Sequence, residues 1–253
     1  MGKKVQPFFI AGNRFAICNV LITVIHNLQS ICILGGLGFS AHGHSQVVTK
    51  LASRSGSAAV TVMVPNSLGP GELLMRYGTE DQKNFFLPKL ASGDIIPCFG
   101  LTGPASGSDA ASMRDTGIVE KRDGVLGVRT TFKKRYITLA PIAGVVGLAF
   151  NLKDPNGLLN GNGSEGITIA LLQKGHPGMR IGNRHDPLSA AFMNGTVEGE
   201  DVFIPMSDLL GGQARAGFGW NMLMVRRKSS RHFIVATIEM LGLKEEDGKK
   251  RNC

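Results

Sequence analysis

Two short stretches decide how this chain is interpreted, Leu101-Thr102-Gly103-Pro104-Ala105-Ser106-Gly107-Ser108-Asp109 and, further along, Lys134-Arg135-Tyr136-Ile137-Thr138. Gly107 allows a tight turn that exposes successive backbone N–H groups, and Ser108 adds a hydroxyl, so the first stretch suits a pyrophosphate. The second stretch offers a flat aromatic at Tyr136 and a hydroxyl at Thr138, which suit the ring end of a ligand. Alone, each is more typical of an ordinary turn or of a half-buried strand aromatic. Together they predict a binding site.

The sequence on the carboxyl side of Asp94 predicts short strands. The candidate segments are rich in β-branched or aromatic residues and are separated by Gly, Pro, Asn and Asp. They cover residues 98–101, 118–121, 125–131, 135–139, 144–152, 167–172, 179–181 and 202–204. Asp123-Gly124 indicates a type I′ hairpin, because that turn needs positive φ at both central residues. No candidate strand is followed by a crossover helix, so the pattern predicts an antiparallel barrel or sandwich, not a doubly wound sheet.

The preceding residues predict helices. Apolar residues recur at helical spacing near 41–54 and again over 70–77, whereas Ala58 to Val64 is apolar throughout and fits either a helix or a strand. Thr79-Glu80-Asp81-Gln82 is a capping box that opens another helix, with Ser92-Gly93 at its end. Pro88 lies inside that pattern and predicts a kink or an early end. The fold class is therefore α+β.

Charge and cysteine content exclude several classes of protein. The net charge of +9 is concentrated at the ends, with +3 in residues 1–34 and +4 in residues 226–253, which leaves +2 for the body. A nucleic-acid groove would need its basic residues on the folded body, so we expect no nucleic-acid partner. The cysteines Cys18, Cys32, Cys98 and Cys253 form no metal-binding or disulfide pattern, which indicates free thiols.

The histidines do not indicate a metal site or an acid–base pair. His42 and His44 are two residues apart and do not share a helix face. His176 and the pair His185-Asp186 each precede a proline, which predicts exposed turns. The apolar run from Phe15 to Leu34 is interrupted by polar residues and does not predict a membrane span.

Several motifs, in one order along the chain, resemble the acyl-CoA dehydrogenases, and more closely their large proteobacterial fatty-acid β-oxidation branch. The matching segments are Gly36-Leu37-Gly38-Phe39-Ser40, residues 65–74, Tyr77-Gly78-Thr79, Gln82-Lys83, residues 101–109, residues 134–141 and Asp201-Val202-Phe203-Ile204-Pro205. The resemblance runs from about Gly35 to about Val225. Gly103 and Ser106 differ from the commoner residues at their positions.

The resemblance implies a site for FAD. The residues that it implies as cofactor contacts are Phe99, Leu101, Thr102, Gly107, Ser108, Tyr136, Ile137 and Thr138. Ser108 would also contact acyl-CoA, Tyr136 stands where the family commonly has Trp, and Thr138 would hydrogen-bond the flavin N5 edge. Apolar strand walls and a hydroxyl near N5 suit the arrival of a hydride.

The resemblance also implies an activity and partners. The family oxidises fatty acyl-CoA to trans-2-enoyl-CoA, using a glutamate base from a C-terminal helical domain, and passes electrons to an electron-transfer flavoprotein or a similar acceptor. Homo-oligomers are known in the family. A cytoplasmic location is implied, with attachment to the periphery of the inner membrane as an alternative.

The resemblance divides the chain into segments. It implies part of the N-terminal helical domain at residues 35–94, the flavin-binding barrel at 95–210 and the start of the C-terminal helical domain at 211–225. Residues 1–34 stay unassigned and 226–253 form an unmatched basic tail. No glutamate in the matched part occupies the position of the base. The loss of pattern at Arg226, together with the rise in basic charge, suggests an interrupted or frame-shifted reading frame.

Two other hypotheses stay open. One is a non-catalytic remnant that serves only as a binding module. The other is a basic binder of nucleic acid or membrane surfaces through Arg226 to Arg231, which we rank last because short charge runs are usually solvated ends.

Overall fold

The computed structural model describes residues 41–63, 70–107, 109–189 and 191–229. The helices are α2 (Ala41–Ala52), α3 (Gly56–Met63), α4 (Pro70–Tyr77), α5 (Glu80–Ser92) and α6 (Gly219–Ser229). The strands are β1 (Pro97–Gly100), β2 (Thr116–Arg122), β3 (Val125–Thr138), β4 (Val145–Lys153), β5 (Gly166–Gln173), β6 (Met179–Arg184) and β7 (Asn194–Pro205). The segregation of α2 to α5 before the strands agrees with the α+β prediction.

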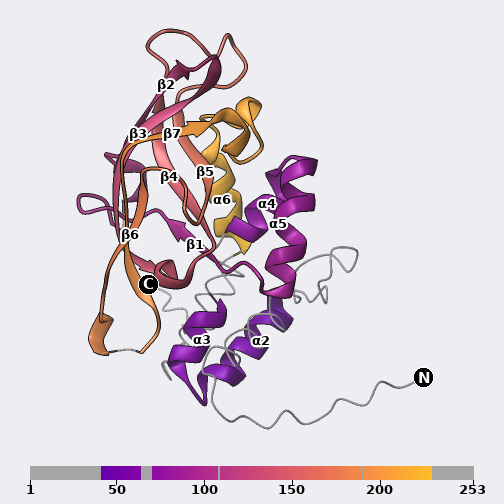
Figure 1. Ribbon diagram of the computed structural model, residues 1–253. Coiled ribbons are helices and arrows are strands. Elements are labelled where there is room, and N and C mark those ends of the chain that lie inside the picture. Colours follow the sequence, from indigo (N-terminus) through magenta and orange to yellow (C-terminus); the bar gives the residue numbers. More distant parts are fainter. Residues whose placement is uncertain (1–40, 64–69, 108, 190, 230–253) are drawn as a thin grey trace, which may run out of the picture.

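The strands form one curled sheet in the order β1-β4-β2-β3-β7-β6, and β5 pairs with β4 (Figure 1). The pairing of β1 with β4 ends where Gly100 lies opposite Leu148. The pairing of β2 with β4 begins three residues further along β4, where Thr116 lies opposite Asn151. β1 and β2 therefore follow each other along the same edge of β4. The chain between them loops out of the sheet and returns to it.

The prediction of a purely antiparallel sheet was wrong, because β4 pairs in parallel with both β1 and β2. A parallel pair needs a crossover connection, which is usually a helix. Here the long hairpin of β2 and β3 supplies that crossover, so the absence of a helix did not exclude parallel pairing. The turn of this hairpin has φ of 50° at Asp123 and 82° at Gly124, as the sequence predicted.

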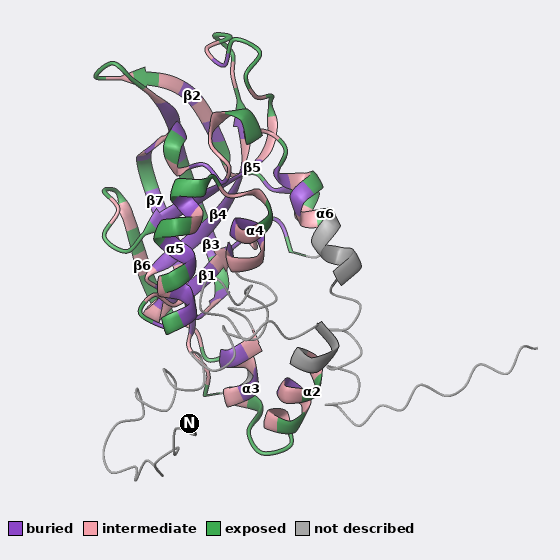
Figure 2. Ribbon diagram, turned by 90° about the vertical axis from the view of Figure 1, so that its right-hand side faces the viewer, coloured by how far each residue is buried: buried purple, intermediate pink, exposed green. Residues whose placement is uncertain are grey.

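The sheet encloses one core and carries helices on its outer side. The inner cluster includes Val128, Phe150 and Leu172, whereas a second cluster joins α4 and α5 to the outer face through residues such as Leu74, Phe86 and Leu171. Figure 2 shows α4 and α5 in front of the sheet, and Figure 1 shows α6 beside β5. α2 and α3 pack on each other in a separate cluster.

The helical predictions were mostly confirmed. Ala58 to Val64 lies largely in a helix, and the capping box at Thr79 is formed by both of its hydrogen bonds. Pro88 does not end α5, which continues to Ser92. Pro88 and Asn84 are both exposed, so water can bind the Asn84 carbonyl that the proline leaves without a donor. The predicted strands at 125–131 and 135–139 form a single strand, β3.

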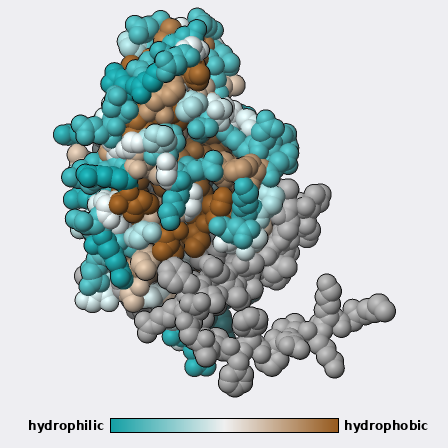
Figure 3. All heavy atoms as spheres, viewed as in Figure 1, coloured by the Kyte–Doolittle hydropathy of each residue, from teal (hydrophilic) through white to brown (hydrophobic). Residues whose placement is uncertain are grey.

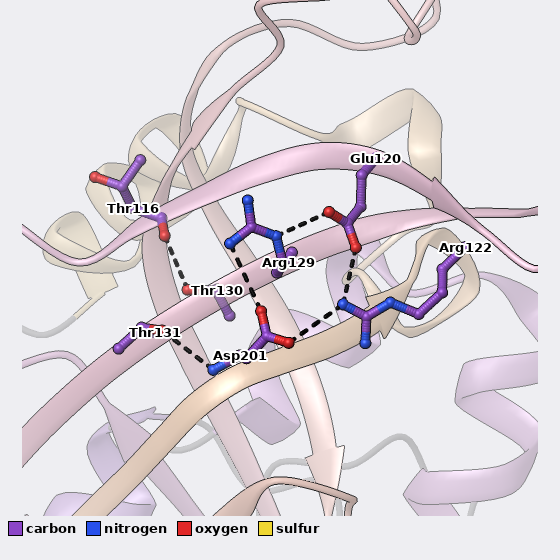
Figure 4. A network of polar contacts seen from close by, with 7 residues as sticks. All are labelled: Thr116, Glu120, Arg122, Arg129, Thr130, Thr131 and Asp201. Atoms are coloured by element: carbon purple, nitrogen blue, oxygen red, sulfur yellow. Dashed lines mark hydrogen bonds and ion pairs between the residues drawn. The ribbon is translucent and has the colours of Figure 1, made fainter.

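At the far end of the sheet, four charged residues connect β2, β3 and β7 (Figure 4). Glu120 accepts hydrogen bonds from Arg122 at 3.0 Å and from Arg129 at 2.8 Å, and Asp201 lies 3.5 and 3.6 Å from the same two guanidinium groups. These carboxylates raise the pKa of the Arg129 guanidinium. The network links three neighbouring strands at a solvent-exposed end of the sheet.

Gln82 connects the helices to the end of the sheet. Its Nε2 donates to the carbonyls of Ser207 at 2.8 Å and Leu209 at 2.7 Å, while its Oε1 accepts the N–H groups of Thr79 at 3.2 Å and Gly211 at 3.0 Å. The side chain is buried. One amide therefore satisfies four backbone groups and fixes the start of α5 against the segment that follows β7.

We expect Gln82→Met to lower the free energy of unfolding by about 3 kcal/mol, because at nearly constant volume it removes the side-chain partner of three backbone groups, while the Leu209 carbonyl keeps the Gly212 N–H. Urea denaturation of the full chain measures the loss. Asn84→Met, on the exposed side of the same helix, is the matched control and should change stability by less than about 0.5 kcal/mol. Equal stability of the two variants would contradict the proposed connection.

A buried lysine holds the start of the loop between β1 and β2. The side chain of Lys134 is fully buried, and its Nζ donates to the Leu101 carbonyl at 3.2 Å and to the Asp115 carboxylate at 2.5 Å. Asp115 also accepts the Lys133 N–H at 3.1 Å. Burial lowers the pKa of the Lys134 ammonium group, and the carboxylate of Asp115 opposes that shift. Lys134 therefore ties β3 to both ends of the loop.

Asp115→Asn should destabilise the fold by about 3–5 kcal/mol, because it keeps an acceptor for the Lys133 N–H but leaves a buried ammonium group without its counter-charge. Chemical denaturation again provides the measurement. Glu80→Gln breaks the exposed Lys83–Glu80 pair and should cost less than about 1 kcal/mol. A loss below about 1 kcal/mol in Asp115→Asn would show that the ion pair does not hold the loop.

Candidate functional site

The loop that leaves the sheet after β1 contains the first of the two sequence stretches. It folds back on itself through a hydrogen bond from the Gly103 N–H to the Ser106 carbonyl, 3.0 Å long. Gly103 and Ser106 are buried, whereas Pro104, Ala105 and Gly107 are exposed. A Cβ atom at Gly107 would meet nothing within 4 Å. The tip of the loop therefore borders open space, where a ligand can approach the backbone.

The structure brings the second stretch beside this loop. The Arg135 N–H donates to the Thr102 carbonyl at 3.0 Å, and the Lys134 ammonium group holds the preceding carbonyl of Leu101. The end of β3 and the start of the loop are thus joined by consecutive contacts. Two segments that are separate in the sequence share one site.

The side chains of the predicted site residues divide between two faces. Ile137 is 3% exposed and belongs to the inner core, so its side chain points away from the site surface. Tyr136 is 56% exposed and Thr138 is half-buried, so both lie on the outer face. Phe99 also lies on the outer side, where it packs with the cluster under α4 and α5. Leu101 and Thr102 are half-buried, and Ser108 lies outside the described residues.

A β-bulge turns Tyr136 outward. The register of β3 against β7 shifts between Lys134 and Ile137, and Tyr136 has a φ of 56°. This left-handed conformation is unfavourable for a bulky residue and persists only where its surroundings support it. The bulge frees the Tyr136 N–H from the strand pairing, and that N–H donates to Nδ1 of His185 at 3.2 Å.

Two residues that the sequence did not assign to the site support this bulge. His185, directly after β6, is half-buried, with its ring centroid 4.5 Å from that of Tyr136. Asn194, the first residue of β7, is buried and its Nδ2 donates to the Thr138 hydroxyl at 3.2 Å. The prediction that His185 occupies an exposed turn was wrong, because the neighbouring proline signals a turn but not what packs against it. No local pattern marks either residue.

The surface around Tyr136 suits an anionic ligand with a flat ring. An exposed aromatic face and a hydroxyl lie beside a loop with an open tip, and the exposed Arg135 precedes Tyr136 on the same strand. The Arg135 guanidinium lies 5.6 Å from the centre of the Tyr136 ring. Figure 3 shows hydrophobic side chains gathered near the level of β1, with hydrophilic ones around them. The residues present therefore fit an aromatic cofactor that carries phosphate groups.

Other candidate chemistries find less support. A groove of about 750 Å³ is lined by residues that include Arg114, Lys133, Arg180 and Glu198, but by none of the predicted site residues. Its Arg180 and Glu198 pair with each other at 2.8 Å. Cys98 is buried, and burial raises the pKa of its thiol, so it is a structural residue and not a nucleophile.

The described residues contain neither a candidate metal site nor a helix that could span a membrane. No group of three or more His, Cys, Asp or Glu side chains in the described part of the chain is arranged to hold a metal ion. Among the same residues, no helix has the length and apolar character to cross a bilayer. Val47, Val48, Leu51 and Ala52 of α2 contribute to the small cluster that it shares with α3, and the side chains of His42 and His44 lie outside the described ones.

Comparisons with curated proteins relate the chain to known sequences. The chain is 30% identical over 224 residues to an acyl-CoA dehydrogenase of Bacillus subtilis (strain 168), a match that covers 87% of this chain and 55% of that protein. It is 47% identical over 76 residues to Protein HemX of Proteus mirabilis, which covers 30% of this chain and 45% of that protein. The chain thus spans about half the length of the curated relatives it matches.

Solved structures share the fold. Butyryl-CoA dehydrogenase from Megasphaera elsdenii superposes with a TM-score of 0.75 at 24% identity, over 94% of this chain and 63% of that one. A glutaryl-CoA dehydrogenase from Mycobacterium smegmatis, solved in complex with FADH2, gives a TM-score of 0.71 at 25% identity, over 89% and 54%. The family described as the N-terminal domain of acyl-CoA dehydrogenases matches residues 30–94. The chain is therefore similar to the acyl-CoA dehydrogenase family, by sequence model over residues 30–94 and by fold over most of its length.

Proposed function

We propose that this chain binds FAD at the junction of the Leu101–Gly107 loop and the end of β3, as part of an enzyme that oxidises acyl-CoA thioesters. The observation that carries the proposal is the hydrogen bond from the Arg135 N–H to the Thr102 carbonyl, which holds the two predicted stretches side by side. The glutaryl-CoA dehydrogenase named above was solved with FADH2, which supports the same cofactor here. When bound, FAD would supply the acceptor for a hydride.

The chain's own residues would position the ring end of the cofactor. Asn194 donates to the Thr138 oxygen, so the hydroxyl hydrogen of Thr138 can turn toward a ligand on the outer face. The exposed ring of Tyr136 offers a flat apolar surface next to it, and the nearby Arg135 guanidinium suits a phosphate group. A fixed donor of this kind stabilises charge that arrives with a hydride.

We assign no general base among the described residues. Near the loop, the Asp115 carboxylate is paired with Lys134 and also binds the Lys133 N–H, so it is not free to accept a proton. The family's proton transfer contributes on the order of 10²–10⁴-fold to the rate. This observation favours a second candidate function, a flavin-binding or acyl-CoA-binding module without turnover.

The narrower substrate, partners and location are also proposals. Fatty acyl-CoA would be oxidised to trans-2-enoyl-CoA in fatty-acid β-oxidation, with electrons passing to an electron-transfer flavoprotein or a similar acceptor. Relatives named for butyryl-CoA, glutaryl-CoA and isovaleryl-CoA support the acyl-CoA class without selecting a chain length. Phe99, Leu101, Thr102, Gly107, Ser108 and Ile137 are proposed as further cofactor contacts, through backbone atoms in the case of Ile137. Homo-oligomers and a cytoplasmic location complete the proposal.

Purified wild-type chain, refolded with FAD, should show the visible absorbance of a bound flavin, and fatty acyl-CoA should bleach it if the chain turns over. Thr138→Val should weaken FAD binding about fivefold to tenfold, because it removes one hydrogen-bonding hydroxyl at constant shape. Thr131→Val, on the same strand but at a contact with Asp201, is the matched control.

The outcomes separate the candidates. Bound flavin that acyl-CoA does not bleach would support the binding module over the enzyme. A wild-type chain that folds but binds no FAD would contradict the proposed site.

A further inference from the structure

We propose that His185 is a positioning residue, which holds the Tyr136–Thr138 segment in its outward conformation by accepting the Tyr136 N–H at its ring nitrogen Nδ1. The proposal deepens the proposed function, because this segment is the one that we place against the flavin. Neither the sequence motifs nor the comparisons assign a role to this histidine.

The strand pairing is irregular on both sides of Thr196 in β7. The register of β7 shifts against β3 between Lys134 and Ile137, and against β6 between Ile181 and Arg184. Both neighbouring strands therefore bulge at the same level of β7. Strand pairing is interrupted there on both sides and resumes at Gly195, so the residues at each bulge need other contacts to hold their positions.

His185 supplies the contact between those two strand ends. Its own N–H donates to the Asn194 carbonyl at 2.9 Å, which anchors the backbone of His185 to β7. Its ring then reaches across to the Tyr136 N–H, 3.2 Å from Nδ1, and packs against the Tyr136 ring. The left-handed φ of Tyr136 is thus supported by a hydrogen bond and by ring packing from one side chain.

The hydrogen bond from the Tyr136 N–H defines which tautomer of the His185 ring supports Tyr136. A nitrogen that accepts an N–H must be unprotonated, so the neutral ring carries its proton on Nε2. Nδ1 also lies 3.3 Å from Oδ1 of Asn194, but it cannot accept from Tyr136 and donate to Asn194 at the same time. The contact that supports Tyr136 therefore belongs to the neutral Nε2–H form.

Asn194 holds Thr138, at the other end of the Tyr136–Thr138 segment, by a hydrogen bond. Its side chain is buried between His185 and Thr138, and its Nδ2 donates to the Thr138 hydroxyl. The side chain of Ile137, between the two supported residues, is held in the core. Three consecutive residues are therefore held in place from β6, β7 and the core, which fixes the ring and the hydroxyl relative to each other.

Two substitutions distinguish the effect of the hydrogen-bond acceptor of His185 from the effect of its ring packing. His185→Phe keeps an aromatic ring beside Tyr136 but removes the acceptor, whereas His185→Asn keeps an acceptor near the position of Nδ1 and removes the ring. His176→Asn is the matched control, since the Nδ1 of His176 contacts the neighbouring Pro177 carbonyl, in a turn before β6. The full chain is used in every case.

The first measurement is amide hydrogen exchange at Tyr136 by NMR, without any cofactor. We expect the Tyr136 amide to be protected in wild type, in His176→Asn and in His185→Asn, and to exchange about fivefold to tenfold faster in His185→Phe. Equal protection in wild type and His185→Phe would overturn the proposal, as would loss of protection in His185→Asn to the level of His185→Phe.

The second measurement is the affinity for FAD from its visible spectrum or fluorescence. We expect His185→Phe to bind FAD about fivefold to tenfold more weakly than wild type, and His185→Asn to restore most of that loss. Unchanged FAD affinity in His185→Phe, in a wild type that binds FAD, would overturn the positioning role. A wild type that binds no FAD would contradict the proposed function, while the exchange experiment still decides whether His185 holds Tyr136.

Discussion

The candidate site depends on one buried ion pair. Lys134 is fully buried inside the curled sheet, where its ammonium group binds the Asp115 carboxylate and the Leu101 carbonyl. Removing a charge from water costs several kcal/mol, so a lysine is buried in this way only where good geometry compensates for the loss of hydration. The contacts of Lys134 decide where the loop leaves β1, where it re-enters the sheet at β2, and how close it lies to the end of β3. Without them, the hydrogen bond between Arg135 and Thr102 would have no fixed geometry.

A second constraint connects this sheet to its helical cover. The Gln82 amide binds four backbone groups from two distant parts of the chain. Gln82 is also the last residue of the capping box at the start of α5, which the sequence alone identifies. The residue thus has a local role at the start of α5 and a long-range role at the end of β7. Because a buried amide without partners is costly, the two roles depend on each other. The helices are therefore held at a defined position over the outer face, where Phe99 also packs.

The candidate site combines a regularly paired strand with one residue in a strained backbone conformation. β3 is paired along its length with β2 or β7, yet at Tyr136 it bulges into a left-handed conformation. Strain at such a position persists where neighbouring groups support it, and His185 and Asn194 supply that support from the ends of β6 and β7. This arrangement turns an aromatic ring and a hydroxyl outward while Ile137 stays in the core. It is consistent with a surface built to receive the flat ring of a cofactor, which is the function that we propose for it.

Local sequence signals determined the capping box at Thr79, the hairpin at Asp123-Gly124, most element types and the two stretches of the site, because caps, turns and side-chain periodicity depend on residues close together in the chain. They did not determine that Pro88 is tolerated, since that depends on which side of α5 faces water. The parallel pairing of β4 depended on a hairpin serving as a crossover. His185 and Asn194 could not be found in advance, because their roles arise where three strand ends meet. Sequence patterns specify neighbours along the chain, whereas only tertiary structure decides which groups from separate strands come within hydrogen-bonding distance.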